Sequence, residues 1–199
     1  MNRRGFMITA LALLGLLAWL VLGWQPQPDE EPDAPLAEIP RGGDFTLMSD
    51  QGPVSLSDFR GRVVLLYFGY TWCPDICPTN LSLIGSVMDS LTEHERARVQ
   101  PLFISVDPQR DTVERLKTYV SYFHPSLIGL TGSETELAGV ARQYGAAFRI
   151  VKQGTETDYP VDHSADTYLV DQQGHLIKSF PHGVQKEVLL KAVRELLGS

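Results

Sequence analysis

Short apolar segments rich in β-branched and aromatic residues recur along the chain between clusters of turn residues, which is typical of strands. Val63–Phe68 and Leu102–Val106 are continuous apolar runs, so we expect them to form buried, central strands. Turn residues at Asp50–Pro53 and at Asp171–Gly174 predict a hairpin near each end of the folded region. The predicted strands are Phe45–Met48, Val54–Leu56, Val63–Phe68, Leu102–Val106, Phe148–Val151, Thr167–Val170 and Leu176–Phe180.

Other segments place apolar residues three and four positions apart, the spacing of one helix face. Leu81, Ile84 and Met88 show this spacing after the first buried strand. A later helix opens on a capping-box pattern at Asp111–Glu114, in which a polar residue is followed three positions later by glutamate, and Ser133–Glu136 opens another helix. The predicted helices are Pro78–Leu91, one from Asp111–Glu114 to about His124–Pro125, one from Ser133–Glu136 to Tyr144–Gly145, and an amphipathic helix around Val188–Leu196.

The order of these elements indicates the fold class. A leading hairpin is followed by alternating strands and helices, then by a second hairpin and a last helix. Such an order implies a mixed sheet covered by helices. We therefore predict an α/β, thioredoxin-like fold with an N-terminal β-hairpin extension over residues 43–199, preceded by one transmembrane helix.

The N-terminal residues predict that transmembrane helix. Arg3 and Arg4 precede an uncharged, apolar run, Phe6–Trp24, which is just long enough to span a bilayer, since about 20 residues are needed. The arginines should stay in the cytoplasm and leave the rest of the chain outside it. A cleaved signal peptide, including one of the twin-arginine type, is the alternative. No small-x-small cleavage site follows the run, so we favour an uncleaved signal-anchor at residues 1–24.

Composition changes sharply after this run and then returns to that of a globular domain. Residues 25–42 alternate prolines with acidic residues and predict an extended, solvated linker. The whole chain of 199 residues is 43% hydrophobic and 21% charged, which allows one folded domain with a core. Its net charge of −7 and pI of about 5.2 argue against nucleic-acid binding, which needs a basic face.

The cysteines, Cys73 and Cys77, lie within one five-residue stretch, so no disulfide can join distant loops. The stretch follows a buried strand and precedes Pro78, a residue well suited to start a helix. A helix N-terminus stabilises anions and lowers a thiol pKa. If the turn is helical, the two sulfurs share one face and can share a metal ion. The pair is also a candidate redox-active disulfide.

A second candidate ligand, His163, lies just before the strand Thr167–Val170, in a segment that should face the cysteines in a thioredoxin-like sheet. Thioredoxins carry a proline before this strand, whereas this chain has Asp166. Two thiolates and an imidazole suit copper(I) and could also hold copper(II), whereas magnesium and calcium prefer oxygen ligands. Zinc usually takes four ligands, and no fourth Cys or His is near in sequence. We therefore predict a copper ion held by Cys73, Cys77 and His163.

Three motifs together, Tyr70–Pro78, Val106–Thr112 and Val161–His163, resemble those of the Sco family, also called SenC, in order and spacing. The resemblance extends from about Gly43 to the C-terminus. It implies a copper chaperone that delivers copper to, or prepares the cysteines of, the binuclear copper centre of cytochrome c oxidase subunit II. It also implies a single-pass protein of the bacterial inner membrane, with its soluble domain on the periplasmic side.

Two enzyme-like functions remain open. In a thiol–disulfide oxidoreductase, Cys73 would attack a partner disulfide and Cys77 would resolve it. In a peroxiredoxin-type peroxidase a threonine should precede the cysteine by a few residues, and Thr71 is too close. Since oxidised cysteines cannot bind copper as thiolates, a thiol reductant is an expected partner.

The remaining polar candidates are expected to have structural or solvated roles. We expect the other histidines to be surface or capping residues, Asp75 and Asp162 to be solvated, and Arg110 and Asp111 to cap and brace a helix start. These histidines are His94, His124, His175 and His182.

Overall fold

The computed structural model describes residues 3–23, 40–151 and 159–198. The chain divides into two compact units, Met1–Glu38 and Ile39–Ser199. The first contains α1, Arg3–Gly23, whose described leucine side chains are exposed. No helix within the described ranges is both long and apolar enough to cross a membrane, so the anchor stays a prediction. Most of the predicted linker lies outside the described residues.

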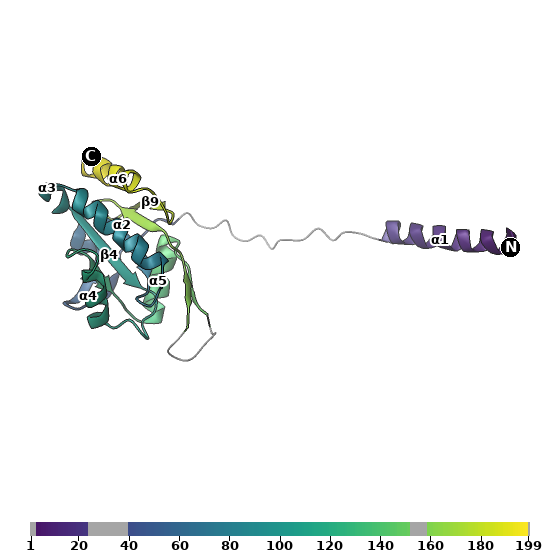
Figure 1. The fold of residues 1–199 in the computed structure, drawn as a ribbon, viewed down its shortest axis with the longest axis horizontal. Helices are drawn as coiled ribbons and strands as arrows, with labels where there is room; N and C mark the ends of the chain where they lie inside the picture. Colours follow the sequence, from purple (N-terminus) through teal and green to yellow (C-terminus); the bar gives the residue numbers. More distant parts are fainter. Residues whose placement is uncertain (1–2, 24–39, 152–158, 199) are drawn as a thin grey trace. The chain divides into compact units, whose positions relative to one another are not determined.

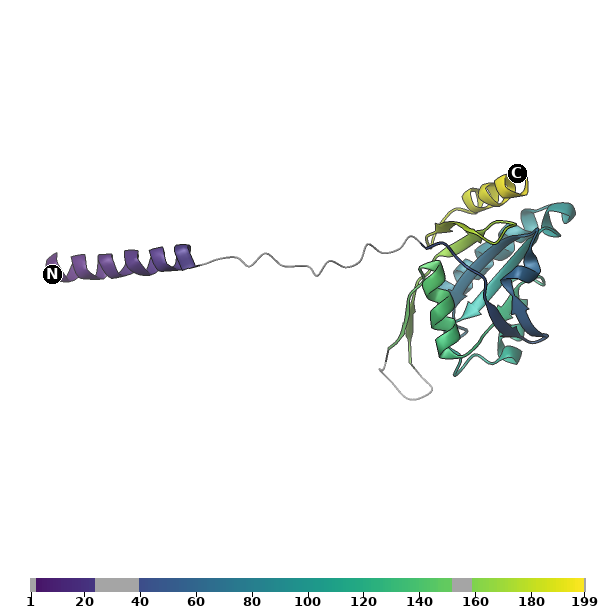
Figure 2. The ribbon, with the colours of Figure 1, turned by 180° about the vertical axis from the view of Figure 1, so that it is seen from behind.

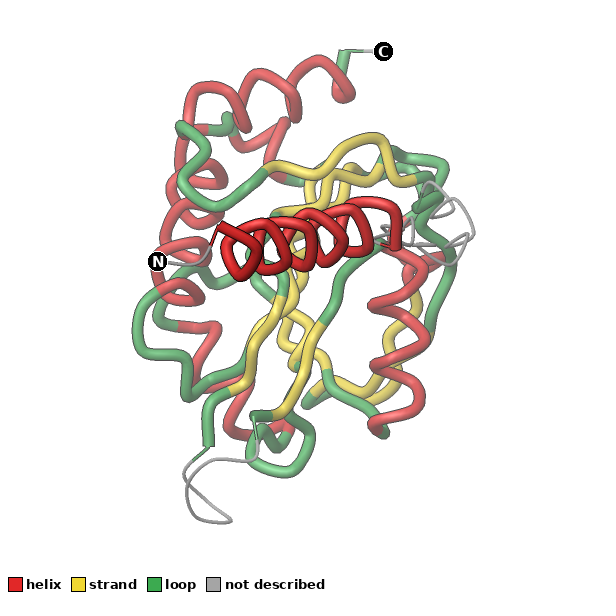
Figure 3. The backbone as a smooth tube through the Cα atoms, turned by 90° about the vertical axis from the view of Figure 1, so that its right-hand side faces the viewer, coloured by secondary structure: helices red, strands yellow, loops and turns green. Residues whose placement is uncertain are grey.

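A five-stranded sheet forms the centre of the second unit (Figures 1 and 3), in the order β5-β4-β3-β8-β9. Its strands β3, β4 and β5 run parallel, whereas β8 and β9 are antiparallel to their neighbours. Every residue of β3 and β4 is buried, as expected for strands covered on both faces. The predicted mixed sheet is therefore confirmed. The strands are β3 Val63–Gly69, β4 Val99–Ser105, β5 Ile128–Leu130, β8 Thr167–Val170 and β9 Leu176–Phe180.

Helices cover both faces of this sheet (Figure 2), and the alternation of side chains along the strands shows which face each one covers. Tyr67 and Phe103 stack on the face of α4, where Phe103 contacts Tyr119. Phe68 points to the other face and contacts Tyr144 of α5. The helices are α2 Ile76–Ser90, the short α3 Glu93–Arg96, α4 Val113–Ser121, α5 Glu134–Tyr144 and α6 Lys186–Leu197.

The predicted start of α5 is correct, whereas the capping box predicted for α4 is wrong. Ser133–Glu136 opens α5 as predicted, and Ser133 and Glu136 form a capping box there with both reciprocal hydrogen bonds. At α4, however, the N-cap is Thr112, whose side chain accepts from the N–H of Arg115, and Asp111 does not cap the helix. This helix also ends at Ser121, before the predicted end.

Several element boundaries differ from the prediction. α2 begins at Ile76, and Pro78 sits in its third position, where its missing N–H costs nothing because the first four N–H groups have no partner within a helix. The second buried strand, predicted at Leu102–Val106, starts earlier, at Val99, and is β4. The hairpin consists of β1 Thr46–Ser49 and β2 Gly52–Ser55, and it is followed by a 3₁₀ turn, Leu56–Phe59. The strand β5 and the short helix α3 were not predicted from the sequence.

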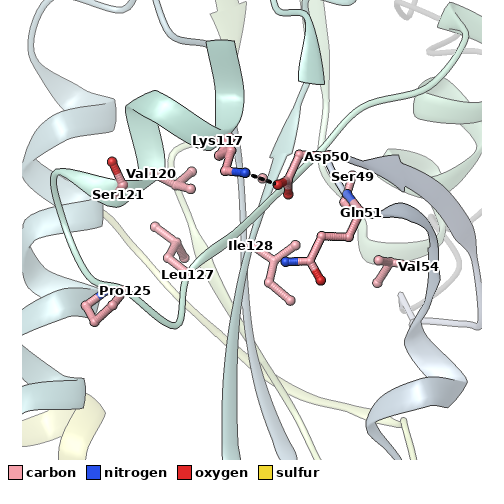
Figure 4. Close-up of a pocket in the computed structure, with 11 residues that line it drawn as sticks. Ser49, Asp50, Gln51, Val54, Lys117, Val120, Ser121, Pro125, Leu127 and Ile128 are labelled. Atoms are coloured by element: carbon pink, nitrogen blue, oxygen red, sulfur yellow. Dashed lines mark hydrogen bonds and ion pairs between the residues drawn. The ribbon is translucent and has the colours of Figure 1, made fainter. Parts of the chain in front are cut away.

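The N-terminal hairpin packs beside α4 and leaves a pocket of about 260 Å³ between them (Figure 4). Apolar side chains, among them Val120 and Ile128, line its floor. Lys117 of α4 and Asp50 of the hairpin form an ion pair of 2.8 Å, drawn as the dashed line in Figure 4. This partly exposed pair ties the hairpin to the helix, and such pairs contribute at most about 1 kcal/mol.

Candidate metal centre

Cys73, Cys77 and His163 come together beside the N-terminus of α2. One ligand atom from each residue lies within 4.8 Å of the other two, and Cys77 Sγ is 3.3 Å from His163 Nε2. Both cysteines are free thiols. Cys77 is buried, whereas Cys73 and His163 are partly exposed. Two candidate ligands thus reach solvent, and the third is fixed in the core.

The sulfurs meet by a different route from the one the spacing suggested. Cys73 lies outside α2, because the N-cap of this helix is Asp75. The Asp75 side chain makes no capping hydrogen bond. Instead, the N–H of Cys77 donates to Cys73 Sγ at 3.4 Å. The Cys73 sulfur therefore acts as the acceptor that an N-cap side chain usually provides.

The two thiols differ in acidity. A hydrogen bond from the Cys77 thiol, together with hydrogen bonds from His163 and from the Cys77 backbone, lowers the pKa of Cys73 against the opposing effect of burial. The hydrogen bond to Cys73 and burial both raise the pKa of Cys77. One thiolate, on Cys73, is therefore favoured beside one protonated thiol.

The imidazole of His163 is oriented by backbone and aromatic contacts. Its strand β7, Val161–His163, was predicted only as a segment preceding β8. Nδ1 lies 2.9 Å from the carbonyl oxygen of Ser164, and in the tautomer that donates to this oxygen Nε2 faces Cys77 as a ligand atom. In the other tautomer the Nε2 proton is the one that can donate to the Cys73 sulfur and lower its pKa. The rings of Tyr67 and Tyr70 contact the imidazole edge-on. The Tyr67 hydroxyl also donates to Cys77 Sγ at 3.8 Å.

Asp111 holds the segment that leads into Cys73, a role that the sequence did not reveal. Its side chain is fully buried. It accepts from the Thr71 N–H at 3.0 Å, from the Thr71 hydroxyl at 2.6 Å and from the Ser105 hydroxyl at 2.7 Å. Burial raises the pKa of Asp111, and these hydrogen bonds oppose that shift. The motif Val106–Thr112 thus supports the cysteine loop, the segment between β3 and α2 that contains Thr71 and Cys73. It does not simply open a helix.

Arg110 joins the same support from the side. Its guanidinium pairs with Asp107 and lies 3.7 Å from the ring centroid of Tyr159. The rings of Tyr70 and Trp72, which flank Thr71, are also within cation–π range. The Tyr159 hydroxyl donates to Asp107 at 2.8 Å. These contacts connect the motif Val106–Thr112 with the segment that leads into Cys73 and with Tyr159, which lies shortly before β7.

Asn80 links the helix to the loop that follows His163. It is a buried polar residue of α2, one turn after Cys77. Its amide donates to the carbonyl oxygen of Ala165 at 2.9 Å, and its Oδ1 lies 3.2 Å from His182 Nδ1. The sequence offered one signal for this role, a polar asparagine among the apolar positions of the predicted helix.

Within the described residues, none of the other histidines and acidic residues joins the three candidate ligands as a group placed to share an ion. His94 and His175 are exposed, as predicted. His124 is buried, contrary to the prediction; its Nδ1 accepts from the N–H of Ser126, and its Nε2 lies 3.6 Å from Asp89 of α2. Asp75 and Asp162 are exposed, as expected.

The donor set fits a soft metal ion. Within the described ranges, the only group of three or more His, Cys, Asp or Glu side chains placed to share an ion is Cys73, Cys77 and His163. Thiolates and imidazole suit copper(I), and the absence of a nearby carboxylate in this group disfavours magnesium and calcium. Cys73, Cys77 and His163 would hold such an ion.

The fold and the site together define a thioredoxin-like α/β domain with a Cys-Cys-His cluster at the start of its first sheet-covering helix. Comparison with known families is more specific. The family model for SCO1/SenC matches residues 34–198. This chain belongs to that family.

Individual relatives agree with this assignment. The chain is 41% identical over 202 residues to the mitochondrial protein SCO2 homolog of Bos taurus, covering 96% of this chain and 74% of the relative. Arabidopsis thaliana ScoI, solved with copper bound, superposes with a TM-score of 0.72 at 39% identity, covering 79% of this chain and 99% of that one. BsSco, described with a disulfide switch and as a member of the Sco family of cytochrome c oxidase assembly proteins, gives 0.61 at 26% identity, over 78% of this chain and 92% of that one.

Proposed function

We propose that this protein is a copper carrier that binds one copper ion through Cys73, Cys77 and His163. The observation that carries the proposal is the convergence of two sulfurs and an imidazole nitrogen within 4.8 Å, with no carboxylate among them. The copper-bound state of the Arabidopsis relative supports it. Copper itself would be cargo, supplied to a recipient and reloaded.

The unequal burial of the ligands suggests an order for copper transfer. Cys73 and His163 are partly exposed, so an incoming ligand of a recipient protein can displace them first. Cys77 is buried and hydrogen-bonded by Tyr67, so it would release the ion last. Protonation of the released Cys77 thiolate, favoured by the raised pKa of that thiol, would help complete the transfer.

We propose that the recipient is the binuclear copper centre of cytochrome c oxidase subunit II. The support is family membership together with the description of BsSco as one of the cytochrome c oxidase assembly proteins. The protein would act from the periplasmic side of a bacterial inner membrane, held there by residues 1–24. Alkylation of Cys73 in intact cells by a membrane-impermeant reagent tests this location, and protection equal to that of a cytoplasmic control protein would contradict it.

Metal analysis of the intact chain, purified in detergent, reduced and loaded anaerobically with copper(I), tests the carrier function. We expect one copper per chain, lost or sharply weakened in Cys73→Ala, Cys77→Ala and His163→Ala. His94→Ala is the matched control, since this histidine is exposed and is not part of the cluster. Wild-type stoichiometry in the His163→Ala variant, or no copper on the unchanged chain, would refute the site.

Thiol–disulfide exchange is the second candidate function, and the acidity of Cys73 favours it. The Cys73 thiolate would attack a partner disulfide and release one partner thiolate. Cys77, once deprotonated, would then attack the mixed disulfide. The products are a Cys73–Cys77 disulfide and a reduced partner, with two electrons passed to the partner. A thiol reductant would regenerate the pair.

His163→Ala separates the two functions. The carrier function requires the imidazole as a ligand, so this change should abolish copper retention. Exchange with a small disulfide such as oxidised glutathione requires the cysteines and should continue in this variant. Loss of exchange with unchanged copper affinity would instead favour the oxidoreductase as the main function.

A further inference from the structure

The strand β6, Phe148–Ile150, leaves one backbone edge unpaired. It pairs with β7 in a two-stranded antiparallel ribbon, and no third strand joins this ribbon among the described residues. The ribbon extends beside α5 in both ribbon views (Figures 1 and 2). Because β7 ends at His163, and Phe148 lies opposite this histidine, the unpaired edge is close to the candidate metal centre.

The register shows which backbone groups point outward. The N–H of Val151 donates to the carbonyl oxygen of Pro160, so this pair is hydrogen-bonded across the ribbon. In an antiparallel ladder such pairs alternate with non-bonded ones. The backbone N–H and C=O groups of Arg149 are therefore directed toward β7. The backbone N–H and C=O groups of Phe148 and Ile150 point away from β7. They form a template for another strand.

An open groove lies along this edge, between β6 and α5. Its volume is about 620 Å³, and its floor includes Val106 and the small residues Ala138 and Gly139. A Cβ atom added at Gly139 would meet nothing within 4 Å, so the groove is open above this residue. Since Phe148 and Ile150 are half-buried, an added strand would cover apolar surface as well as gain hydrogen bonds.

Two exposed cations border this groove and favour an acidic residue in a partner, against one exposed carboxylate in the lining, Glu134, which accepts from Gln109 at 2.9 Å. Arg149 is exposed and pairs with Asp162 across the ribbon at 2.9 Å. Arg142 of α5 is a second exposed cation at the groove. A second copy of this chain fits poorly, because full antiparallel pairing of two β6 strands places Arg149 opposite Arg149, and like charges in that position repel.

We propose that β6 is a docking edge for an extended segment of the copper-exchanging partner, which adds as a third strand to the ribbon. An acidic residue of that segment lies opposite Arg149, and apolar residues lie opposite Phe148 and Ile150. The proposal rests on the carrier function for the identity of the partner. Two strand spacings, about 10 Å in total, then separate the docked strand from β7 and its His163.

A synthetic peptide tests this docking without a natural partner. The probe is acetylated and amidated Ser-Thr-Val-Glu-Val-Thr-Ser, titrated into the isotope-labelled intact chain in detergent while amide signals are followed by NMR. We expect saturable shifts of the Phe148 and Ile150 amides. N-methylation of both valine amides, which face β6, should weaken binding at least tenfold. N-methylation of the glutamate amide, which faces solvent, should change it less than twofold.

Variants of the protein complete the test. Gly139→Leu fills the groove and should weaken peptide binding at least tenfold, whereas Gly139→Ala controls for the change in helix propensity. Replacing glutamate by lysine in the peptide should also weaken binding, and Arg149→Glu should restore it. Cys73→Ser should lose copper yet bind the peptide normally, which separates failure of docking from failure of the carrier function. No saturable shift at β6, insensitivity to valine N-methylation, or concentration-dependent dimerisation through β6 would overturn the proposal.

Discussion

Replacement of Asp111 tests whether the motif Val106–Thr112 positions the cysteine loop. The fully buried carboxylate accepts three hydrogen bonds, two from Thr71 and one from Ser105. Thr71 lies two residues before Cys73, so these hydrogen bonds fix the backbone that leads into the candidate ligand. Asp111→Ala removes the acceptor of the half-buried Thr71 N–H.

The size of the effect follows from the hydrogen bonds. A hydrogen bond to a charged group contributes about 1.5–3 kcal/mol, but burying the carboxylate costs part of that sum. We expect Asp111→Ala to lower the free energy of unfolding by about 3–5 kcal/mol. Asp111→Asn keeps the shape. Its amide oxygen can accept from the Thr71 N–H and the Ser105 hydroxyl, and its NH₂ can donate to the Thr71 hydroxyl, which also accepts from Arg115. The charge-assisted part and the acceptor of the Thr71 hydroxyl are lost, so we expect a smaller cost of about 1–2 kcal/mol.

Denaturant unfolding of the reduced, metal-free protein measures the stability of each variant, and competition with a copper(I) chelator measures its copper affinity. Copper affinity should fall in Asp111→Ala and fall less in Asp111→Asn. Asp50→Asn is the control. It makes the same chemical change at the surface ion pair with Lys117 and should cost less than about 1 kcal/mol. If Asp111→Ala lost stability but kept wild-type copper affinity, the positioning role would be wrong.

Three further changes have defined outcomes. Asn80→Ala removes the hydrogen bond to Ala165 and should cost about 1–3 kcal/mol in denaturant unfolding, and unchanged copper affinity would show that this bond does not hold the histidine loop. Gly69→Ala places a Cβ 2.7 Å from Cys77 Sγ. It should cost about 1–3 kcal/mol through overpacking and weaken copper binding in the chelator assay, whereas wild-type values would contradict the close packing. Burial lowers the pKa of His124 in the folded chain, so the unfolded chain takes up its proton first as pH falls below about 6.5. The contribution of this histidine to stability is present above that pH and lost below it, and His124→Gln should flatten the slope of unfolding free energy between pH 7 and 5; an unchanged slope would exclude His124 as its source.

Local patterns were sufficient to predict most of the fold. Buried strands such as Val63–Gly69 are visible as apolar runs, because both of their faces are covered. The helix start at Ser133–Glu136 was predicted correctly because the hydrogen bonds that cap it all form within four residues. The strand Ile128–Leu130 has only three residues with a central glycine, and its identity depends on pairing with β4. A pattern within one segment cannot reveal such pairing.

The interactions that support the site were harder to predict, since they join residues far apart in sequence. Asp111 sits next to a good N-cap, so the local pattern favoured a capping role. Its partner Thr71 is 40 residues earlier, and only the parallel pairing of β3 with β4 brings the ends of these strands together. A buried carboxylate can be satisfied by several kinds of donor, and the sequence alone does not select among them.

The start of α2 explains why a three-residue spacer suits these cysteines. Because the helix begins at Ile76, Cys77 occupies its second position, where the backbone N–H has no partner within the helix. The loop returns the Cys73 sulfur to this N–H, so one sulfur caps the helix and the other projects from it. A start at Pro78 would have left Cys77 outside the helix and its N–H without this role. The same geometry that stabilises a thiolate on Cys73 therefore also places both sulfurs beside His163, and acidity and ligand convergence have one structural origin.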